Sequence, residues 1–86
     1  MKVGIPSVLE RYTGGTREVE ASGTTLTEMI KDLDERYPGI RFRMVNERGA
    51  LRPHVRIFVN GTIAHKLTVP VCDTDEIVIL QALSGG

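Results

Sequence analysis

The residues best suited to do chemistry are the last two of the chain, Gly85 and Gly86. Glycine has no side chain and moves freely in φ and ψ, so such an end can enter a narrow channel in another protein. Its carboxylate is sterically open, but it is a poor electrophile until it is activated, for example as an acyl-adenylate that releases AMP. The chain has neither a G-x-x-x-x-G-K nor a G-x-G-x-x-G phosphate-binding motif, so a partner enzyme would have to supply that activation.

The other reactive side chains do not form a recognisable site. Cys72 is the only cysteine and cannot form an internal disulfide, so we expect a small buried or half-buried filler. His54 and His65 are not spaced with Cys72 as zinc ligands are, and we expect no metal site. The acidic stretch 73–76 is typical of a solvated turn before a strand, with contact to a partner's basic surface as the alternative.

The charge of the chain is zero overall but unevenly distributed. The stretch 36–56 contains six arginines and one acidic residue, Glu47. A nucleic-acid-binding domain usually has a basic excess throughout and stacking aromatics, whereas the pI here is 6.7. We therefore expect a solvated or protein-docking surface and no nucleic acid. The arginines are Arg36, Arg41, Arg43, Arg48, Arg52 and Arg56.

Length and hydropathy predict one small domain. Its 86 residues are 41% apolar and 26% charged, a balance typical of a globular protein with a modest core. The longest apolar runs, such as 77–80, are too short to cross a membrane, and the N-terminus lacks the apolar segment of a signal peptide. We expect a cytoplasmic protein with no membrane contact that is monomeric when free.

The hydrophobic patterns predict two strands, a helix, a broken stretch and two further strands. Strands are expected at 2–9, at 17–22 after a Gly-Gly turn, at 55–61 ending in Asn-Gly, and at the end of 73–83. Short strand pieces are expected within 62–72, and a short second helix around 40–45. This order predicts an α+β fold, the β-grasp roll, with a mixed sheet of four to five strands and one main helix packed on one face. The domain would span 1–81, and 82–86 would form a flexible tail. The pairing of the first strand with the last remains open.

The main helix has a clear start and end. Thr25-Leu26-Thr27-Glu28 fits a capping box, in which Thr25 and Glu28 satisfy free N–H groups. Apolar residues then recur at spacings of three and four, and Pro38-Gly39 ends the helix. The expected apolar stripe is Leu26, Met29, Ile30, Leu33 and Tyr37.

Period two in the last two long strands separates their faces. Val55, Ile57, Val59, Ile77 and Ile79 are expected to face the helix. Phe58, Val78 and Leu80 would then lie on the uncovered face and form an apolar docking patch. The alternative is a register shifted by one residue, which would make these three side chains part of the core.

Several segments together resemble one known family. They are IP at 5–6, TGG at 13–15, ASGTTL at 21–26, DLDERYPGI at 32–40, VNG at 59–61 and DEIVILQALSGG at 75–86. The chain resembles the ubiquitin-like sulfur carrier proteins of the MoaD/ThiS family, and most closely the CysO-type carriers of the actinobacterial cysteine pathway. MoaD-type carriers often have prolines before the final glycines, whereas this chain has Gln81-Ala82-Leu83-Ser84.

The resemblance implies a sulfur carrier that is not itself an enzyme and binds no cofactor. An E1-like adenylyltransferase of the MoeB/ThiF type would use ATP to adenylate the Gly86 carboxylate. A sulfur donor or sulfurtransferase would convert it to a thiocarboxylate, which a biosynthetic enzyme making cysteine, a thiosugar or a cofactor would accept. Ser84 and Gly85 would pass through the partner's channel, and Phe58, Val78 and Leu80 would contact the partner.

Two other functions remain compatible with the sequence. The first is a ubiquitin-like modifier that is joined through Gly86 to lysines of target proteins. The second is a non-catalytic interaction domain of β-grasp shape in which the two glycines are incidental.

Overall fold

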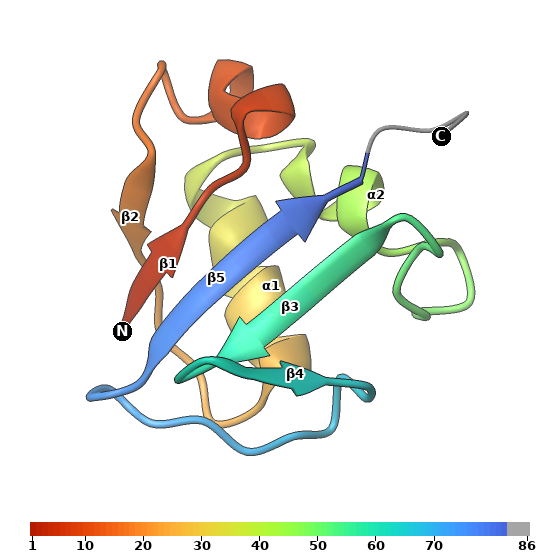
Figure 1. Cartoon of the computed structure of the whole chain (residues 1–86). Coiled ribbons are helices and arrows are strands. Elements are labelled where there is room, and N and C mark those ends of the chain that lie inside the picture. Colours follow the sequence, from red (N-terminus) through yellow and green to blue (C-terminus); the bar gives the residue numbers. More distant parts are fainter. Residues whose placement is uncertain (83–86) are drawn as a thin grey trace.

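The computed structural model describes residues 1–82, which form a five-stranded sheet with one main helix on one face (Figure 1). The strand order across the sheet is β2-β1-β5-β3-β4. The last strand of the chain therefore lies in the middle, between the first strand and the third. The strands are β1 (Lys2–Gly4), β2 (Glu18–Glu20), β3 (Val55–Val59), β4 (Thr62–Ala64) and β5 (Glu76–Gln81).

The pairing that the sequence left open is a parallel one. β1 pairs with β5 in parallel, with Val3 opposite Ile77, while the pairs β1–β2, β3–β4 and β3–β5 are antiparallel. A parallel pair needs a crossover connection, and here the chain between the two strands includes the main helix. The mixed sheet and its single main helix confirm the predicted β-grasp roll.

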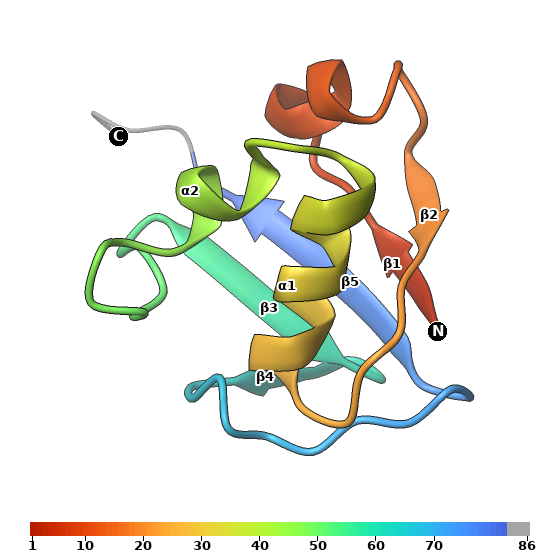
Figure 2. The same ribbon diagram turned by 180° about the vertical axis from the view of Figure 1, so that it is seen from behind.

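The main helix, α1 (Leu26–Arg36), lies against one face of the sheet (Figure 2). Leu26, Met29, Ile30 and Leu33 are almost completely buried, as the spacing predicts. Full burial of each such side chain stabilises the fold by about 1.5–3 kcal/mol. A short helix, α2 (Ile40–Met44), follows and buries Ile40 and Met44.

The start of α1 differs in detail from the predicted capping box. Thr25 is the N-cap, and its Oγ1 accepts a hydrogen bond from the Glu28 N–H (3.2 Å). The Glu28 carboxylate, however, accepts from the N–H and the hydroxyl of Thr24, one residue before the cap (both 2.8 Å). The N–H groups of Leu26 and Thr27, which have no partner within the helix, donate to the carbonyls of Val69 and Leu67 in a distant segment.

The first predicted strand is too long. β1 ends at Gly4, and a 3₁₀ helix, η1 (Ser7–Tyr12), occupies most of the expected strand. Pro6 has no N–H to continue a ladder, and it immediately precedes the 3₁₀ turn. Two of the apolar residues that suggested a strand, Val8 and Leu9, lie in η1 instead, and Leu9 is buried there. The second strand is also shorter than expected, Glu18–Glu20 instead of 17–22.

Both η1 and α2 lie at the end of the sheet toward which β5 runs, as both views show (Figures 1 and 2). The C-terminal end of β5 therefore emerges beside two short helices. Among residues 1–82 no helix is long and apolar enough to cross a membrane.

Candidate functional site: the end of β5

β5 is the strand that precedes the last residues of the chain, and it is fixed in position because it is hydrogen-bonded to β1 on one side and to β3 on the other. The pairing with β3 reaches Gln81, opposite Val55. One further bond follows, from the Ala82 N–H to the His54 carbonyl (2.8 Å). The position from which the tail departs is thus fixed to the centre of the sheet. Ser84, Gly85 and Gly86 lie outside the described residues, and the predicted domain boundary at 81–82 stays a prediction.

The predicted strand register is confirmed. Ile57, Ile77 and Ile79 are almost completely buried, while Val78 and Leu80 are 42% and 49% exposed. Phe58 lies directly opposite Val78 on the same uncovered face and is half-buried. The sheet thus brings Phe58, Val78 and Leu80 together as the sequence predicts, and their contact with a partner stays a prediction.

Two further residues belong to this apolar face. Ile63 of β4 lies opposite Phe58. The alternation of side chains along a strand could have predicted this position, once the hairpin of β3 and β4 was assumed. Gly4 of β1 lies opposite Val78, where an added Cβ would be 3.7 Å from the Val78 side chain. The absence of a side chain at Gly4 leaves the Val78 side chain open on that flank. We call Phe58, Ile63, Val78 and Leu80 the apolar face.

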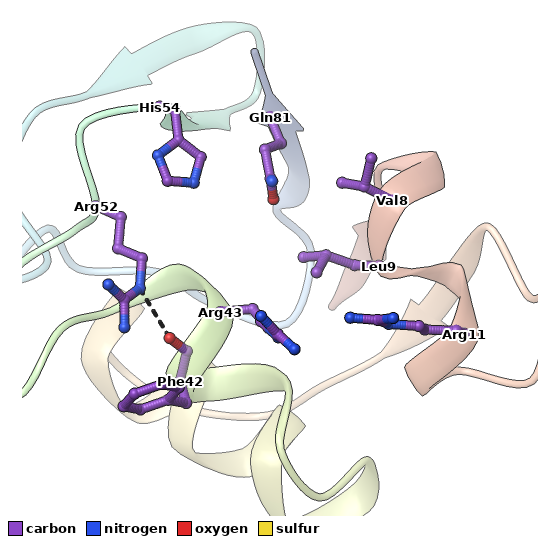
Figure 3. A pocket seen from close by; sticks show the side chains of 8 residues that line it. All are labelled: Val8, Leu9, Arg11, Phe42, Arg43, Arg52, His54 and Gln81. Atoms are coloured by element: carbon purple, nitrogen blue, oxygen red, sulfur yellow. Dashed lines mark hydrogen bonds between the residues drawn. The ribbon is translucent and has the colours of Figure 1, made fainter. Parts of the chain in front are cut away.

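The opposite side of the β5 end borders a pocket (Figure 3). Gln81 follows the alternation of Ile77 and Ile79, so its side chain lies on the helix side of the sheet, at the edge of the core. The pocket has a volume of about 340 Å³ and lies between η1, α2 and the start of β3. Its lining residues are Val8, Leu9, Arg11, Phe42, Arg43, Arg52, His54 and Gln81.

Three arginines line this pocket, and uncharged groups hold each of them. The Arg43 Nε donates a hydrogen bond to the Tyr12 hydroxyl (2.6 Å), and the Arg11 guanidinium lies 5.3 Å from the centre of the Tyr12 ring. The Arg52 Nε donates to the Phe42 carbonyl (2.8 Å), and its guanidinium lies 4.8 Å from the centre of the Phe42 ring. We call Arg11, Arg43 and Arg52 the arginine cluster.

The arginine cluster changes the acidity of its tyrosine. The hydrogen bond from Arg43 is the main cause that lowers the pKa of Tyr12 below its ordinary value of 10.0, since it stabilises the phenolate. Arg11 acts in the same direction, whereas desolvation opposes both. Sequence reasoning missed this cluster, because it placed Arg11 beyond the first strand and had no reason to bring it near Arg43.

The other end of β5 begins at a hydrogen-bonded turn. The Asp75 carboxylate accepts from the Asn60 amide and from the Cys72 N–H (both 2.9 Å), and Asn60 in turn accepts from the Glu76 N–H (2.9 Å). The Asn60 hydrogen bond is the first cause that lowers the pKa of Asp75, followed by that of Cys72. The stretch is an exposed turn before a strand, as the sequence predicts, and within it the half-buried Asp75 also joins the β3–β4 turn to the start of β5.

Cys72 is exposed, which contradicts the expectation of a buried or half-buried filler. Its sulfur contacts the Thr74 hydroxyl (3.2 Å), and it precedes β5, at the opposite end from the tail. In residues 1–82, histidine, cysteine and acidic side chains do not gather in any group of three that could hold a metal ion.

Comparison with known proteins gives consistent matches over nearly the whole chain. The model of the ThiS family matches residues 3–86. The chain is 38% identical over 89 residues to the sulfur carrier protein CysO of Mycobacterium tuberculosis, which covers 98% of this chain and 96% of that protein.

Two solved structures extend the comparison. The crystal structure of the Amycolatopsis orientalis BexX/CysO complex matches with a TM-score of 0.90 and 38% identity, over 99% of this chain and 98% of that chain. The solution structure of small archaeal modifier protein 1 from Methanosarcina acetivorans matches with a TM-score of 0.80 and 28% identity, over 99% and 94%.

Proposed function

The chain belongs to the ThiS family, and from this premise we propose that it carries sulfur at the terminal carbonyl of Gly86. The sulfur carrier role follows from the family and from the identity with CysO, which confirms the resemblance seen in the sequence. The observation that carries the proposal is that β5, central in the sheet, ends between an apolar face and an arginine cluster, five residues before Gly86. A partner that binds these fixed surfaces receives the tail in a defined position.

The proposed chemistry has two steps, both in partner enzymes. First, the Gly86 carboxylate attacks the α-phosphate of ATP in an adenylyltransferase, which forms an acyl-adenylate and releases pyrophosphate. A hydrosulfide ion then attacks the acyl carbon and AMP leaves, so that a thiocarboxylate and a proton result. With a persulfide donor the product is an acyl disulfide, and a thiol reductant is needed to release the thiocarboxylate.

In this proposal the protein is a cosubstrate. Its own contribution is to bind two enzymes in turn and to deliver the tail to each. Micromolar affinity, about −8 kcal/mol, is the scale expected for a partner that must also dissociate. The small apolar face suits such a reversible contact better than a large permanent interface.

We also propose a second enzyme partner that receives the sulfur. The likeness to a CysO chain solved in complex with BexX supports docking to a partner, because that structure matches 99% of this chain. This second enzyme would act in the synthesis of cysteine, a thiosugar or a cofactor. Each of these syntheses can use a thiocarboxylate as the sulfur nucleophile.

Exchange of labelled pyrophosphate into ATP tests the activation step. With an adenylyltransferase of the MoeB/ThiF type, exchange should depend on this protein and should be lost when one residue is added after Gly86. Exchange that continues with the extended protein, which mass spectrometry shows to be untrimmed, would contradict activation at Gly86.

A second candidate function is conjugation to proteins, which the likeness to small archaeal modifier protein 1 favours. It would use the same activated Gly86, with a lysine amine in place of sulfur as the nucleophile. Recovery from cells of peptides that carry a branched isopeptide to Gly86 would establish it. A thiocarboxylate without such conjugates would leave the carrier function alone.

A further inference from the structure

The arginine cluster has no acidic partner in the part of the chain that the structure describes. The ion pairs found in residues 1–82 involve Arg17, Arg36 and the N-terminal amine, and none involves Arg11, Arg43 or Arg52. Acidic groups near in sequence have other contacts, since Glu10 pairs with Arg17 (3.7 Å) and Asp34 accepts from the backbone N–H groups of Gly39 and Arg41 (both 3.1 Å).

The cluster is nevertheless held in place. Each guanidinium contacts an aromatic ring, and two also donate to a hydroxyl or a carbonyl, so uncharged groups fix the side chains without neutralising them. Figure 3 shows the guanidinium ends of Arg11 and Arg43 pointing toward one another across the pocket. Two like charges directed into one hollow favour an anion between them.

The pocket lies directly at the departure point of the tail. Gln81, the last residue of β5, and His54, which accepts the Ala82 hydrogen bond, both line it. An enzyme that contacts the end of β5 on this side would therefore cover this pocket. Covering guanidinium groups with an uncharged surface would remove them from water without compensation, which is strongly unfavourable.

We propose that the arginine cluster is a docking site for aspartate or glutamate side chains at the channel entrance of the adenylating enzyme. Carboxylates match guanidinium groups in charge and can accept two parallel hydrogen bonds. The exposed Phe42 ring, which stacks on Arg52, adds an apolar border that would help to exclude water. This inference rests on the proposed function and adds to it the chemistry of the partner's surface.

The contact would divide recognition between two sides of β5. The apolar face lies on one side and gives affinity through apolar burial, whereas the arginine cluster lies on the other and directs the approach through charge. Electrostatic docking weakens with salt, because exposed charges are screened over about 10 Å at 0.1 M ionic strength. The two contributions can thus be separated by experiment.

The test compares charge reversals inside and outside the pocket. Arg11→Glu, Arg43→Glu and the matched control Arg48→Glu change the net charge equally, but Arg48 does not line the pocket. We would measure kcat and KM for the carrier by pyrophosphate exchange with a MoeB/ThiF-type enzyme, at about 0.05 M and about 0.5 M salt. Thermal unfolding shows whether each variant is folded. Arg43→Glu removes the hydrogen bond to the Tyr12 hydroxyl and could lose stability for that reason, in which case Arg11→Glu still provides the test.

The expected result is a KM raised about tenfold or more at low salt for the two pocket variants, with kcat unchanged and little effect of Arg48→Glu. The wild-type KM should rise with salt, while the pocket variants should respond less. Equal effects of all three reversals would overturn the docking site. A lower KM in the pocket variants would also overturn it, and would indicate that the cluster holds the chain's own Gly86 carboxylate.

The two proposals fail in different ways. No exchange with the wild-type protein would overturn activation at Gly86 and, with it, the docking site. Exchange that is normal in every variant would leave activation intact and overturn the docking site alone.

Discussion

The Ala82 N–H donates a hydrogen bond of 2.8 Å to the carbonyl of His54, one residue beyond the end of β5 and one residue before β3. This bond fastens the root of the tail to the neighbouring strand. It places the departure point beside both the apolar face and the arginine cluster. Four residues then separate this anchor from the end of the chain, which at full extension span at most about 14 Å. A partner's reactive centre must lie within that reach.

Adjacent residues of β5 should separate docking from folding. Leu80→Ala should raise the KM for activation several-fold and change stability by less than about 0.5 kcal/mol, because Leu80 is half exposed. Ile79→Ala should lower the free energy of unfolding by about 2–5 kcal/mol, because Ile79 is almost completely buried. Urea unfolding and pyrophosphate exchange measure the two effects. A large loss of stability in Leu80→Ala would contradict its assignment to the apolar face.

A charge placed at Phe58 should weaken activation without unfolding the protein. Phe58 is half-buried and lies opposite both Val78 and Ile63. Phe58→Asp should weaken activation and leave the protein folded, since the residue lies on the face away from α1. Circular dichroism with exchange assays would check this. An unfolded variant would show that Phe58 supports the core.

Gly23 should be required for the start of α1. Its φ is +152°, and an added Cβ would lie 2.7 Å from the Met29 nitrogen, inside van der Waals contact. Gly23→Ala should therefore lower the free energy of unfolding by about 1–3 kcal/mol. Gly4→Ala is the matched control, because the nearest atoms to its added Cβ lie at an ordinary 3.7 Å. Equal stability of the two variants would contradict the proposed close contact at Gly23.

Asp75 should make stability depend on pH in the acid range. Its folded-state pKa is lowered from 3.8 by the Asn60 and Cys72 hydrogen bonds, so its contribution is fully present above 3.8 and is lost as pH falls through the folded pKa. Asp75→Asn should reduce stability at neutral pH, and the difference from wild type should shrink below about pH 4. Urea unfolding across pH measures this, with Asp73→Asn as control. A difference that does not change with pH would refute a role for the Asp75 charge.

The sequence predicted the parts of the fold that depend on local pattern. The stripe of α1 follows from a helical period, and the faces of β3 and β5 follow from strict alternation, so Ile79 and Leu80 were assigned correctly. The short helix at Ile40–Met44 was also anticipated. In each case the side chains that decide the structure are neighbours in the chain.

One error was local, and the others came from contacts between distant segments. The 3₁₀ helix Ser7–Tyr12 replaced an expected strand, because Pro6 interrupts the ladder while Leu9 can still reach the core. The carbonyls of Leu67 and Val69 satisfy helix N–H groups from 40 or more residues away, which no local motif indicates. For the same reason the pocket between Arg11 and Arg43 could not be predicted, since it requires η1 and α2 to meet at the end of β5.

Localisation of sulfur in the C-terminal peptide tests the central claim most directly. The protein would be incubated with a MoeB/ThiF-type enzyme, ATP and sulfide, alkylated, digested and analysed by tandem mass spectrometry. The site must be localised, because exchange of oxygen for sulfur adds nearly the same mass as oxidation of a methionine, and the exposed Cys72 also alkylates. We predict an alkylated thiocarboxylate on Gly86 that requires ATP. An unmodified Gly86 in the presence of an active enzyme, ATP and sulfide would contradict it.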